Sequence, residues 1–223
     1  MMTDTANTKD CTSNCPTKSL LSYVKLRGAV AAIHGSYFCP AEYSSCASKE
    51  GQFLYPLYNP FLRKWINEKA IPFTAEPTIA VDTTGHLFMY LKTMAFKNSG
   101  AFLARFKADS KAAGGSGVLL ATISNGPPLV YQRTNIVGRY QLDTKQRTVK
   151  TTRGAIGWRG TLLYIFVVHH ATVADAAAVA KNMNLEYAMN LDGGGSTALY
   201  AQGKYIMGPG RNIPNAVLIL PKK

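Results

Sequence analysis

The chain is 223 residues long, with 25 Lys and Arg against 12 Asp and Glu, a formal net charge of +13. Its length and 47% hydrophobic fraction allow one large domain or two small ones with a substantial core. No apolar run approaches the roughly 20 residues of a membrane span, and no charged-then-apolar signal peptide opens the chain. The positive charge favours anionic partners. Because the basic residues are scattered, a phosphate-bearing substrate is favoured over duplex nucleic acid.

Residues 1–28 form a polar N-terminal segment, which we expect to be flexible. All the cysteines, Cys11, Cys15, Cys39 and Cys46, lie near this end of the chain. An even number in a loop-like region predicts two disulfides, with three connectivities open. Disulfides indicate an extracytoplasmic protein that is secreted, periplasmic or at the cell surface. A zinc site is the weaker alternative, because the cysteine spacings are loose.

The first half of the folded domain alternates apolar runs with turns. Residues 29–33 predict a buried strand. Residues 39–77 are a Cys- and Pro-rich surface insertion, inside which residues 61–68 have the spacing of a helix. Beyond the insertion, the pattern predicts a hairpin over residues 78–91 and a short helix over 101–108.

The second half contains the clearest helix, over residues 172–184, where Thr172 and Asp175 form a capping box. Strands are predicted on either side of it, over 162–168 and 185–191. This is one strand–helix–strand unit. We therefore expect an α+β fold, with a single domain over residues 29–221 that combines a mixed β-sheet, hairpins and packed helices.

The last of these strands leads into the most unusual stretch of the chain. Asp192 is followed by Gly193, Gly194, Gly195, Ser196 and Thr197. Consecutive glycines cost backbone entropy, so they indicate positive φ or close approach of the backbone to a ligand. A tight hairpin would account for Asp-Gly but not for the residues that follow. The stretch is predicted to be a ligand site with Asp192 as its carboxylate.

Five segments, taken in order, resemble the phosphodiester glycosidase family. They are residues 32–38, 121–130, 153–157, 190–199 and 211–216, and the Asp-Gly-Gly-Gly-Ser-Thr core of the fourth is the most specific. The resemblance covers roughly residues 29–220. The chain departs from the family pattern at His34, where the family usually has Asn, at Ser36, where it has Gly, and at Gly154, where it has Thr.

The resemblance implies hydrolysis of a sugar-1-phosphodiester, such as a GlcNAc-1-phosphodiester, to a free sugar and a phosphomonoester. The substrate would be a cell-envelope or extracellular glycopolymer. It implies Asp192, Arg153 and His34 as catalytic residues. Substrate binding falls to Gly193, Gly194, Gly195, Ser196, Thr197, Arg211, Asn215 and Asn125. We expect no cofactor, and no His/Asp/Glu spacing demands a metal ion.

The two arginines suit bidentate contact with a phosphate, the alternative for each being a surface salt bridge. We expect Arg153, Asp192, Arg211 and Asn215 to converge on one pocket, with His34 at its edge. Two other functions stay open. A non-catalytic glycan- or phosphopolymer-binding domain of the same shape is favoured by the change at His34, and a nucleic-acid-binding protein rests on charge alone.

Overall fold

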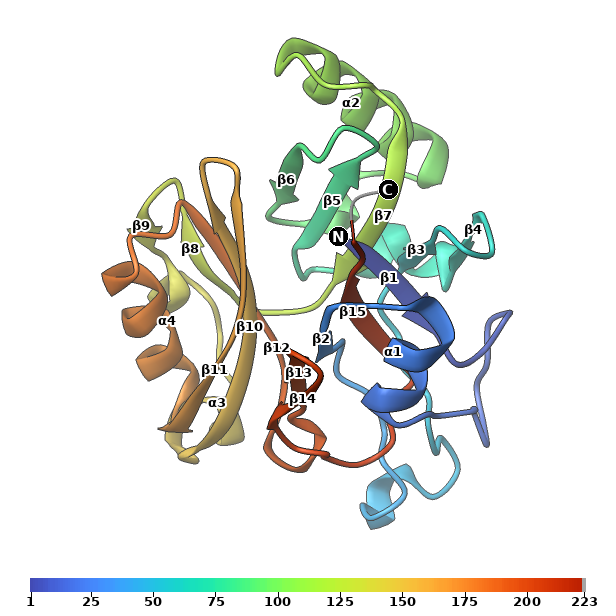
Figure 1. The fold of residues 1–223 in the computed structure, drawn as a ribbon, viewed down its shortest axis with the longest axis vertical. Helices are drawn as coiled ribbons and strands as arrows, with labels where there is room; N and C mark the ends of the chain where they lie inside the picture. The colour runs from blue at the N-terminus through green and yellow to red at the C-terminus, as the bar shows by residue number, and fades with distance from the viewer. Residues whose placement is uncertain (222–223) are drawn as a thin grey trace.

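The computed structural model describes residues 1–221 (Figure 1). The strands are β1 (Met2–Thr5), β2 (Ala31–His34), β3 (Leu57–Asn59), β4 (Lys64–Ile66), β5 (Thr78–Asp82), β6 (Leu87–Tyr90), β7 (Leu119–Ser124), β8 (Pro128–Tyr131), β9 (Thr134–Asn135), β10 (Thr151–Arg159), β11 (Leu162–Ala171), β12 (Tyr187–Gly193), β13 (Leu199–Ala201), β14 (Lys204–Met207) and β15 (Asn215–Ile219). The α-helices are α1 (Leu20–Arg27), α2 (Ser99–Ala112), α3 (Thr144–Thr148) and α4 (Val173–Asn182). Single 3₁₀ turns include η1 (Ser44–Cys46) and η5 (Gly194–Ser196).

The strands of the described chain divide among four sheets. Two have five strands, in the orders β11-β10-β12-β8-β9 and β1-β15-β2-β13-β14. The others are β6-β5-β7 and the β3-β4 hairpin. Hairpins and helices interleave with them along the chain, which confirms the α+β class. The sequence pattern did not reveal that the strands would separate into several sheets.

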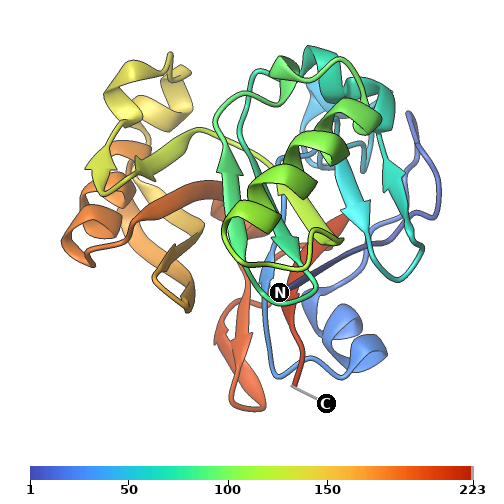
Figure 2. The same cartoon turned by 90° about the horizontal axis from the view of Figure 1, so that it is seen from above.

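The β10 sheet contains the predicted strand–helix–strand unit. β11 and β12 both pair antiparallel with β10, so they run parallel to each other with β10 between them. α4 connects them and lies on the outer side of this sheet in Figures 1 and 2. The capping box of Thr172 and Asp175 is present, and the buried alanines of α4 pack against Leu129 and Leu185. The prediction for this helix is confirmed.

The N-terminal segment is folded, contrary to the expectation of a flexible tail. β1 pairs with β15 and forms the edge of the five-stranded sheet β1-β15-β2-β13-β14. α1 buries Leu20 and Tyr23, begins at a Ser19 side chain that caps it, and ends at Gly28 in the left-handed conformation. Burial of these two large side chains supplies the stability that the polar composition of the segment concealed.

The helix expected over residues 61–68 is wrong. Asn59 ends β3, and its side-chain oxygen accepts hydrogen bonds from the backbone N–H groups of Phe61 and Leu62. This contact forms a turn in place of a helix N-terminus. The chain then returns as β4, whose Trp65 packs edge-on against Phe102 of α2. The apolar residues that suggested a helical period belong to a two-stranded hairpin.

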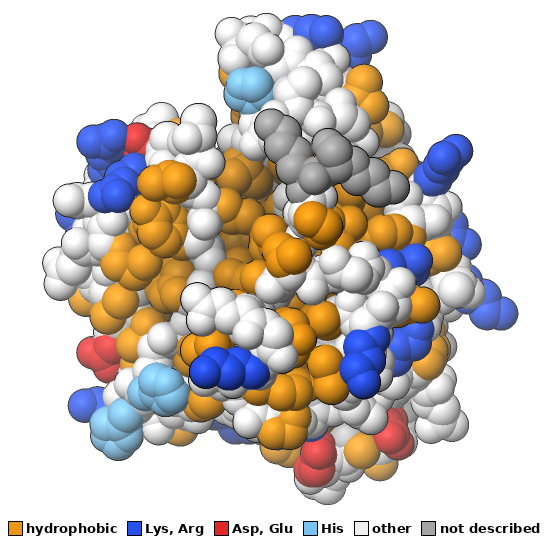
Figure 3. All heavy atoms as spheres, viewed as in Figure 1, with side chains coloured by type: hydrophobic (Ala, Val, Ile, Leu, Met, Phe, Trp, Pro, Cys, Tyr) orange, Lys and Arg blue, Asp and Glu red, His pale blue; other side chains and the backbone are white. Residues whose placement is uncertain are grey.

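A shared core joins three of the sheets. Its buried members include Ile33 of β2, Ile79 of β5, Ile156 of β10, Leu191 of β12 and Val217 of β15. Each comes from a strand whose alternate side chains face inward. Figure 3 shows apolar side chains gathered on the face where β11 approaches β2 and β13. The sheets are therefore held together by one apolar cluster.

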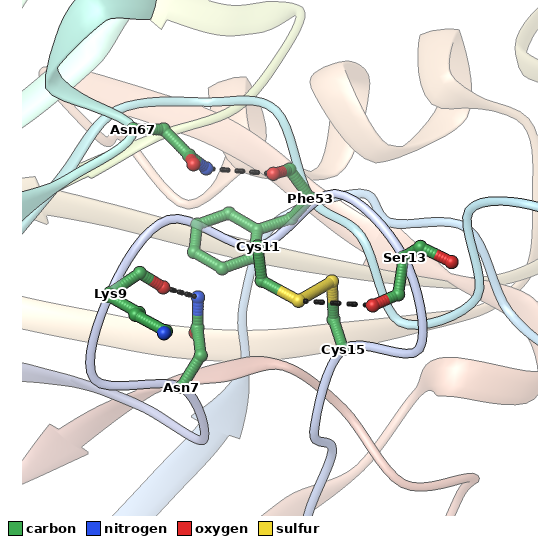
Figure 4. Close-up of a disulfide and its surroundings, with 7 residues drawn as sticks. All are labelled: Asn7, Lys9, Cys11, Ser13, Cys15, Phe53 and Asn67. Carbon is green, nitrogen blue, oxygen red and sulfur yellow. Dashed lines mark hydrogen bonds between the residues drawn. A yellow bond between two sulfur atoms is a disulfide. The ribbon is translucent and has the colours of Figure 1, made fainter.

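Both predicted disulfides form, as Cys11–Cys15 and Cys39–Cys46. Figure 4 shows the first of them beside Phe53 and Asn67 of the 39–77 segment. The backbone N–H of Cys15 donates to the carbonyl of Glu50 at 2.8 Å, which ties the two segments together. Within residues 1–221 no helix is long and apolar enough to cross a bilayer.

Candidate functional site

A cavity of about 460 Å³ opens where the end of β12 meets α3, the start of β10 and the loop after β2. Its lining residues are Tyr37, Phe38, Pro40, Tyr43, Asp143, Lys145, Gln146, Val149, Thr151, Arg153, Asp192, Gly193, Gly194, Gly195, Ser196 and Arg211. Asp192, Arg153 and Arg211 therefore converge on one pocket, as expected. The cavity combines cationic, anionic and aromatic side chains, a combination that suits an anionic, ring-containing ligand.

Asp192 is fixed at the mouth of this cavity by the end of β12. Its backbone N–H donates to the carbonyl of Gly35 at 3.0 Å, and its Oδ1 accepts from the N–H of Gly193 at 2.8 Å. Burial raises the pKa of the Asp192 carboxyl, while hydrogen bonds from Ser196 and Gly193 and the charges of His34 and Arg211 act in the opposite direction. The carboxylate is thus desolvated but surrounded by donors and cations.

Local geometry explains why glycines follow Asp192. Gly194 has φ of +59°, in the left-handed region where a side chain is strained. A Cβ at Gly195 would overlap the Arg211 guanidinium, so only glycine lets that arginine lie against the turn. The η5 turn therefore brings the backbone next to the Arg211 guanidinium, and close approach of this backbone to a ligand stays a prediction.

Arg211 has hydrogen-bonding capacity to spare at the cavity. Its Nη1 donates to Glu42 Oε2 at 3.0 Å, and the Arg211 side chain is only 19% exposed. Its Nε is buried without a hydrogen-bond partner among the residues described. Because Nε is buried against the Gly195 turn, it does not face the open cavity. An anion in the cavity would therefore be held by the terminal nitrogens of Arg211.

Arg153 is engaged differently. Its Nε donates to the carbonyl of Ala171 at 3.2 Å, and its Nη2 donates to the carbonyls of Lys145 and Val149 at 2.9 and 2.8 Å. These bonds tie β10 to α3 and to the end of β11. Most of the fork expected to hold phosphate is instead used to position α3 at the cavity wall.

Three expected substrate-binding residues lie behind the cavity wall. Asn215 Oδ1 accepts from the Ser36 N–H at 2.9 Å. Asn125 Oδ1 accepts from the Tyr37 N–H at 2.8 Å, and Thr197 Oγ1 donates to the carbonyl of Thr152 at 3.3 Å. None of the three is among the lining residues. Asn215 and Asn125 hold the loop that presents Tyr37, so their contacts shape the cavity from outside.

His34 is fully buried and does not line the cavity. Its Nε2 lies 2.7 Å from the backbone carbonyl of Asp192, and its Nδ1 lies 3.1 Å from the backbone carbonyl and 3.2 Å from the backbone N–H of Ala198. Because a carbonyl oxygen only accepts, Nε2 carries a proton and donates to Asp192, whereas Nδ1 faces both an acceptor and a donor on Ala198. The imidazole thus fixes the backbone on both sides of the glycine turn.

Sequence comparison gives this site a family. A model described as phosphodiester glycosidase matches residues 27–220. The chain belongs to the phosphodiester glycosidase family. No match was found among curated proteins.

Solved structures share the fold of this family member at low sequence identity. The catalytic domain of zebrafish N-acetylglucosamine-1-phosphodiester alpha-N-acetylglucosaminidase, auto-inhibited by its pro-peptide, superposes with a TM-score of 0.68 at 18% identity, covering 93% of this chain and 68% of that one. A hypothetical protein from Synechocystis gives 0.58 at 13% identity, covering 96% and 55%. A putative exported protein from Burkholderia pseudomallei gives 0.56 at 10%, covering 99% and 71%.

Two of the departures from the phosphodiester glycosidase pattern are in direct contact. A Cβ at Gly154 would overlap the Cε1 and Nε2 atoms of His34. The larger side chain at position 34 therefore requires the smallest residue at position 154. The third departure, Ser36, uses its hydroxyl to donate to the carbonyl of Ser124 at 2.9 Å. The substitutions preserve the backbone around Asp192 by a different set of contacts.

The sequence analysis missed several residues of the cavity. Asp143, Lys145 and Gln146 come from a polar stretch that forms α3, and Tyr37 follows the predicted β2 strand. The signal for α3 was present, because Asp143 and Gln146 form a capping box. Pro40 and Tyr43 belong to residues 39–46, closed by the second disulfide, which we call the rim loop. Among residues 1–221 no cluster of three or more His, Cys, Asp and Glu could hold a metal ion.

Proposed function

We propose that this protein hydrolyses a sugar-1-phosphodiester and releases the free sugar and a phosphomonoester. The observation that carries the proposal is that the carboxylate of Asp192 and the guanidinium of Arg211 line one cavity. Membership of the phosphodiester glycosidase family supports the reaction class. A GlcNAc-1-phosphodiester is the substrate we favour.

The two groups divide the work of the reaction. Water forms a new bond to the anomeric carbon and gives up a proton to solvent, while the bond between the anomeric carbon and the phosphate oxygen breaks and its electron pair goes to that oxygen. Ionised Asp192 matches the positive charge that develops at the anomeric carbon. Arg211, the N–H groups of Gly194 and Gly195, and Lys145 match the negative charge of the phosphate. Because phosphate is a weakly basic leaving group, little acid assistance is needed.

The remaining expected catalytic residues act through position. His34 holds the backbone carbonyl of Asp192, and Arg153 holds α3. In this proposal neither transfers a proton to the substrate. Both determine where the carboxylate and the cavity wall lie, within the fractions of an ångström that such chemistry requires.

The two disulfides support an extracytoplasmic location. The net charge of +13 supports substrates that are part of anionic cell-envelope or extracellular glycopolymers. We propose this setting together with the reaction, since both features suit a protein that works on charged polymers outside the cytoplasm.

The test is to incubate the protein with synthetic GlcNAc-1-phosphodiesters and to measure free GlcNAc, with Asp192→Asn in parallel. The expected result is release by the native protein and loss of release in the variant. Tight binding of the compounds by both proteins without any release would establish the alternative, a glycan- or phosphopolymer-binding domain.

A further inference from the structure

The hydroxyl of Tyr37 lies between two amide side chains at the cavity wall. Asn190 Nδ2 approaches the phenolic oxygen at 2.7 Å, and Gln146 Nε2 approaches it at 3.2 Å. An amide nitrogen donates hydrogen bonds and does not accept them. Neither amide nitrogen therefore accepts the proton of the tyrosine hydroxyl.

The orientation of each amide is fixed by its other contacts. Asn190 Nδ2 also faces the carbonyl oxygens of Gly126 and Leu191, at 3.2 and 2.6 Å. Turning that amide would place its oxygen against two carbonyl oxygens. Gln146 Oε1 accepts from the backbone N–H of Asp143 in the α3 capping box. Turning this amide would break the capping box, so the assignment of donors is determined by the network.

The proton of the Tyr37 hydroxyl is thus not used in either amide contact. Among residues 1–221 no oxygen accepts a hydrogen bond from it, and Tyr37 lines the same cavity as Asp192. Burial raises the pKa of Tyr37 to about 12, so the hydroxyl stays protonated at neutral pH. The available acceptor for this proton is whatever occupies the cavity.

We propose that Tyr37 donates a hydrogen bond to the phosphate oxygen that leaves the sugar. The choice of oxygen rests on the proposed function, whereas the direction of the donation rests on the amide network. As the sugar–oxygen bond breaks, negative charge grows on that oxygen and the hydrogen bond strengthens. The proton stays on Tyr37, because a phosphomonoester is a much weaker base than a phenolate.

The first test compares Tyr37→Phe with the native protein on a GlcNAc-1-phosphodiester. The variant keeps the ring and removes the O–H, so kcat should fall about 10- to 100-fold while KM changes less. The matched control is Tyr164→Phe on β11, which removes a hydroxyl that accepts a hydrogen bond from Arg159 at 3.2 Å outside the cavity. The control should keep native kcat. An unchanged kcat in Tyr37→Phe would overturn the proposal.

A second variant separates donation to the ligand from support of the loop. In Gln146→Glu a carboxylate replaces the amide donor, so it accepts the Tyr37 proton and turns it away from the cavity. Binding of inorganic phosphate, measured by calorimetry, should weaken about fivefold or more in this variant and in Tyr37→Phe. Because both changes remove the same hydrogen bond, the double variant should bind little worse than either single one. Fully additive losses would mean that Gln146→Glu acts by charge repulsion alone, and would overturn the proposal.

The two readouts separate this inference from the proposed function. Native protein that binds phosphate with the expected cycle but releases no sugar leaves Tyr37 as a phosphate donor and rejects the hydrolase. If Tyr37→Phe releases sugar as fast as the native protein, the hydrolase function stands and the role of Tyr37 is rejected. Native protein that neither binds phosphate nor releases sugar overturns both. Should Tyr37→Phe fail to fold, Gln146→Glu is compared with Val149→Glu, which adds the same charge to the cavity lining without contacting the Tyr37 hydroxyl. Gln146→Glu should then weaken phosphate binding more than Val149→Glu, and equal weakening would overturn the proposal.

Discussion

At the scale of single residues, the candidate site concentrates on Asp192. Burial raises the pKa of this carboxyl, so the ionised form that the chemistry needs is the form that folding disfavours. Such a conflict between stability and charge is typical of functional carboxylates. Neighbours at the site reduce it, with hydrogen bonds from Ser196 and Gly193 and the positive charge of Arg211.

Asp192→Asn should lower sugar release about 100-fold or more, since it removes the charge that matches the developing cation. Its effect on stability has the opposite sign. A carboxyl whose folded-state pKa lies above its unfolded value stabilises the fold only in acid, and this contribution is lost as pH rises through the folded pKa. At pH 7 the variant should therefore unfold at the same or a higher urea concentration than the native protein. Any advantage should shrink toward pH 3. A variant that unfolds more easily at pH 7 would show that the carboxylate is a net structural support.

The pair His34 and Gly154 provides a second prediction at this scale. Gly154→Thr alone should lower the free energy of unfolding by about 1–3 kcal/mol, because the new side chain overlaps the buried imidazole. Adding His34→Asn to it restores the residues that the family usually carries at both positions. The double variant should recover most of the lost stability in urea unfolding. Additive losses would indicate that the two departures are independent.

At the scale of elements, the structure departs from the sequence pattern where side chains contact the backbone at a distance. The capping box of α4 is local, and it was read from Thr172 and Asp175. The equivalent signal for α3, Asp143 with Gln146, lies in a polar stretch for which no helix was predicted. The turn at Asn59 could not be predicted from the sequence. Its amide oxygen accepts the hydrogen bonds that form a turn, in place of a helix N-terminus, only once β3 has formed.

The rim loop leads to a prediction about an element. Glu42 is 60% exposed and pairs with Arg211 at 3.0 Å, so its carboxylate occupies part of the fork that we assign to phosphate. An exposed ion pair is worth at most about 1 kcal/mol. Glu42→Gln should therefore tighten inorganic phosphate binding by up to about fivefold. Glu50→Gln serves as the control, since it removes the same charge close by without breaking this ion pair. Weaker binding in Glu42→Gln would mean that Glu42 orients Arg211 instead of competing for it.

At the scale of the whole molecule, the Asp-Gly-Gly-Gly-Ser-Thr stretch and the arginines located the cavity from sequence alone. What the sequence did not reveal is which of these groups face it. Arg153 spends its donors on backbone carbonyls, and His34 lies behind the wall. The place of His34 depends on the packing of segments more than a hundred residues apart, since it contacts Asp192 and Ala198. The place of Arg153 depends on how β10 folds against α3 and the end of β11. No local pattern contains that information.

The shared core leads to a prediction for the fold as a unit. Ile79 and Ile123 of the β6-β5-β7 sheet pack in one cluster with Ile156 and Trp158 of the β10 sheet. No sheet can therefore open without exposing apolar surface of the others, and unfolding should be a single cooperative transition.

The two tryptophans allow this to be measured, because they lie in different sheets. Trp65 contacts Phe102 of α2, and Trp158 stacks on Tyr187 of β12. In Trp158→Phe the fluorescence reports only Trp65, and in Trp65→Phe only Trp158. Within each variant, the fluorescence midpoint in urea should coincide with the midpoint from far-UV circular dichroism, whatever the stability lost by the substitution. In Trp158→Phe, fluorescence that changes at a lower urea concentration than the dichroism would show that the β3-β4 hairpin, which contributes no residue to the shared cluster, unfolds on its own. In Trp65→Phe the same outcome would show that the β10 sheet unfolds on its own, and the cluster around Ile79, Ile123 and Ile156 would then not couple the sheets.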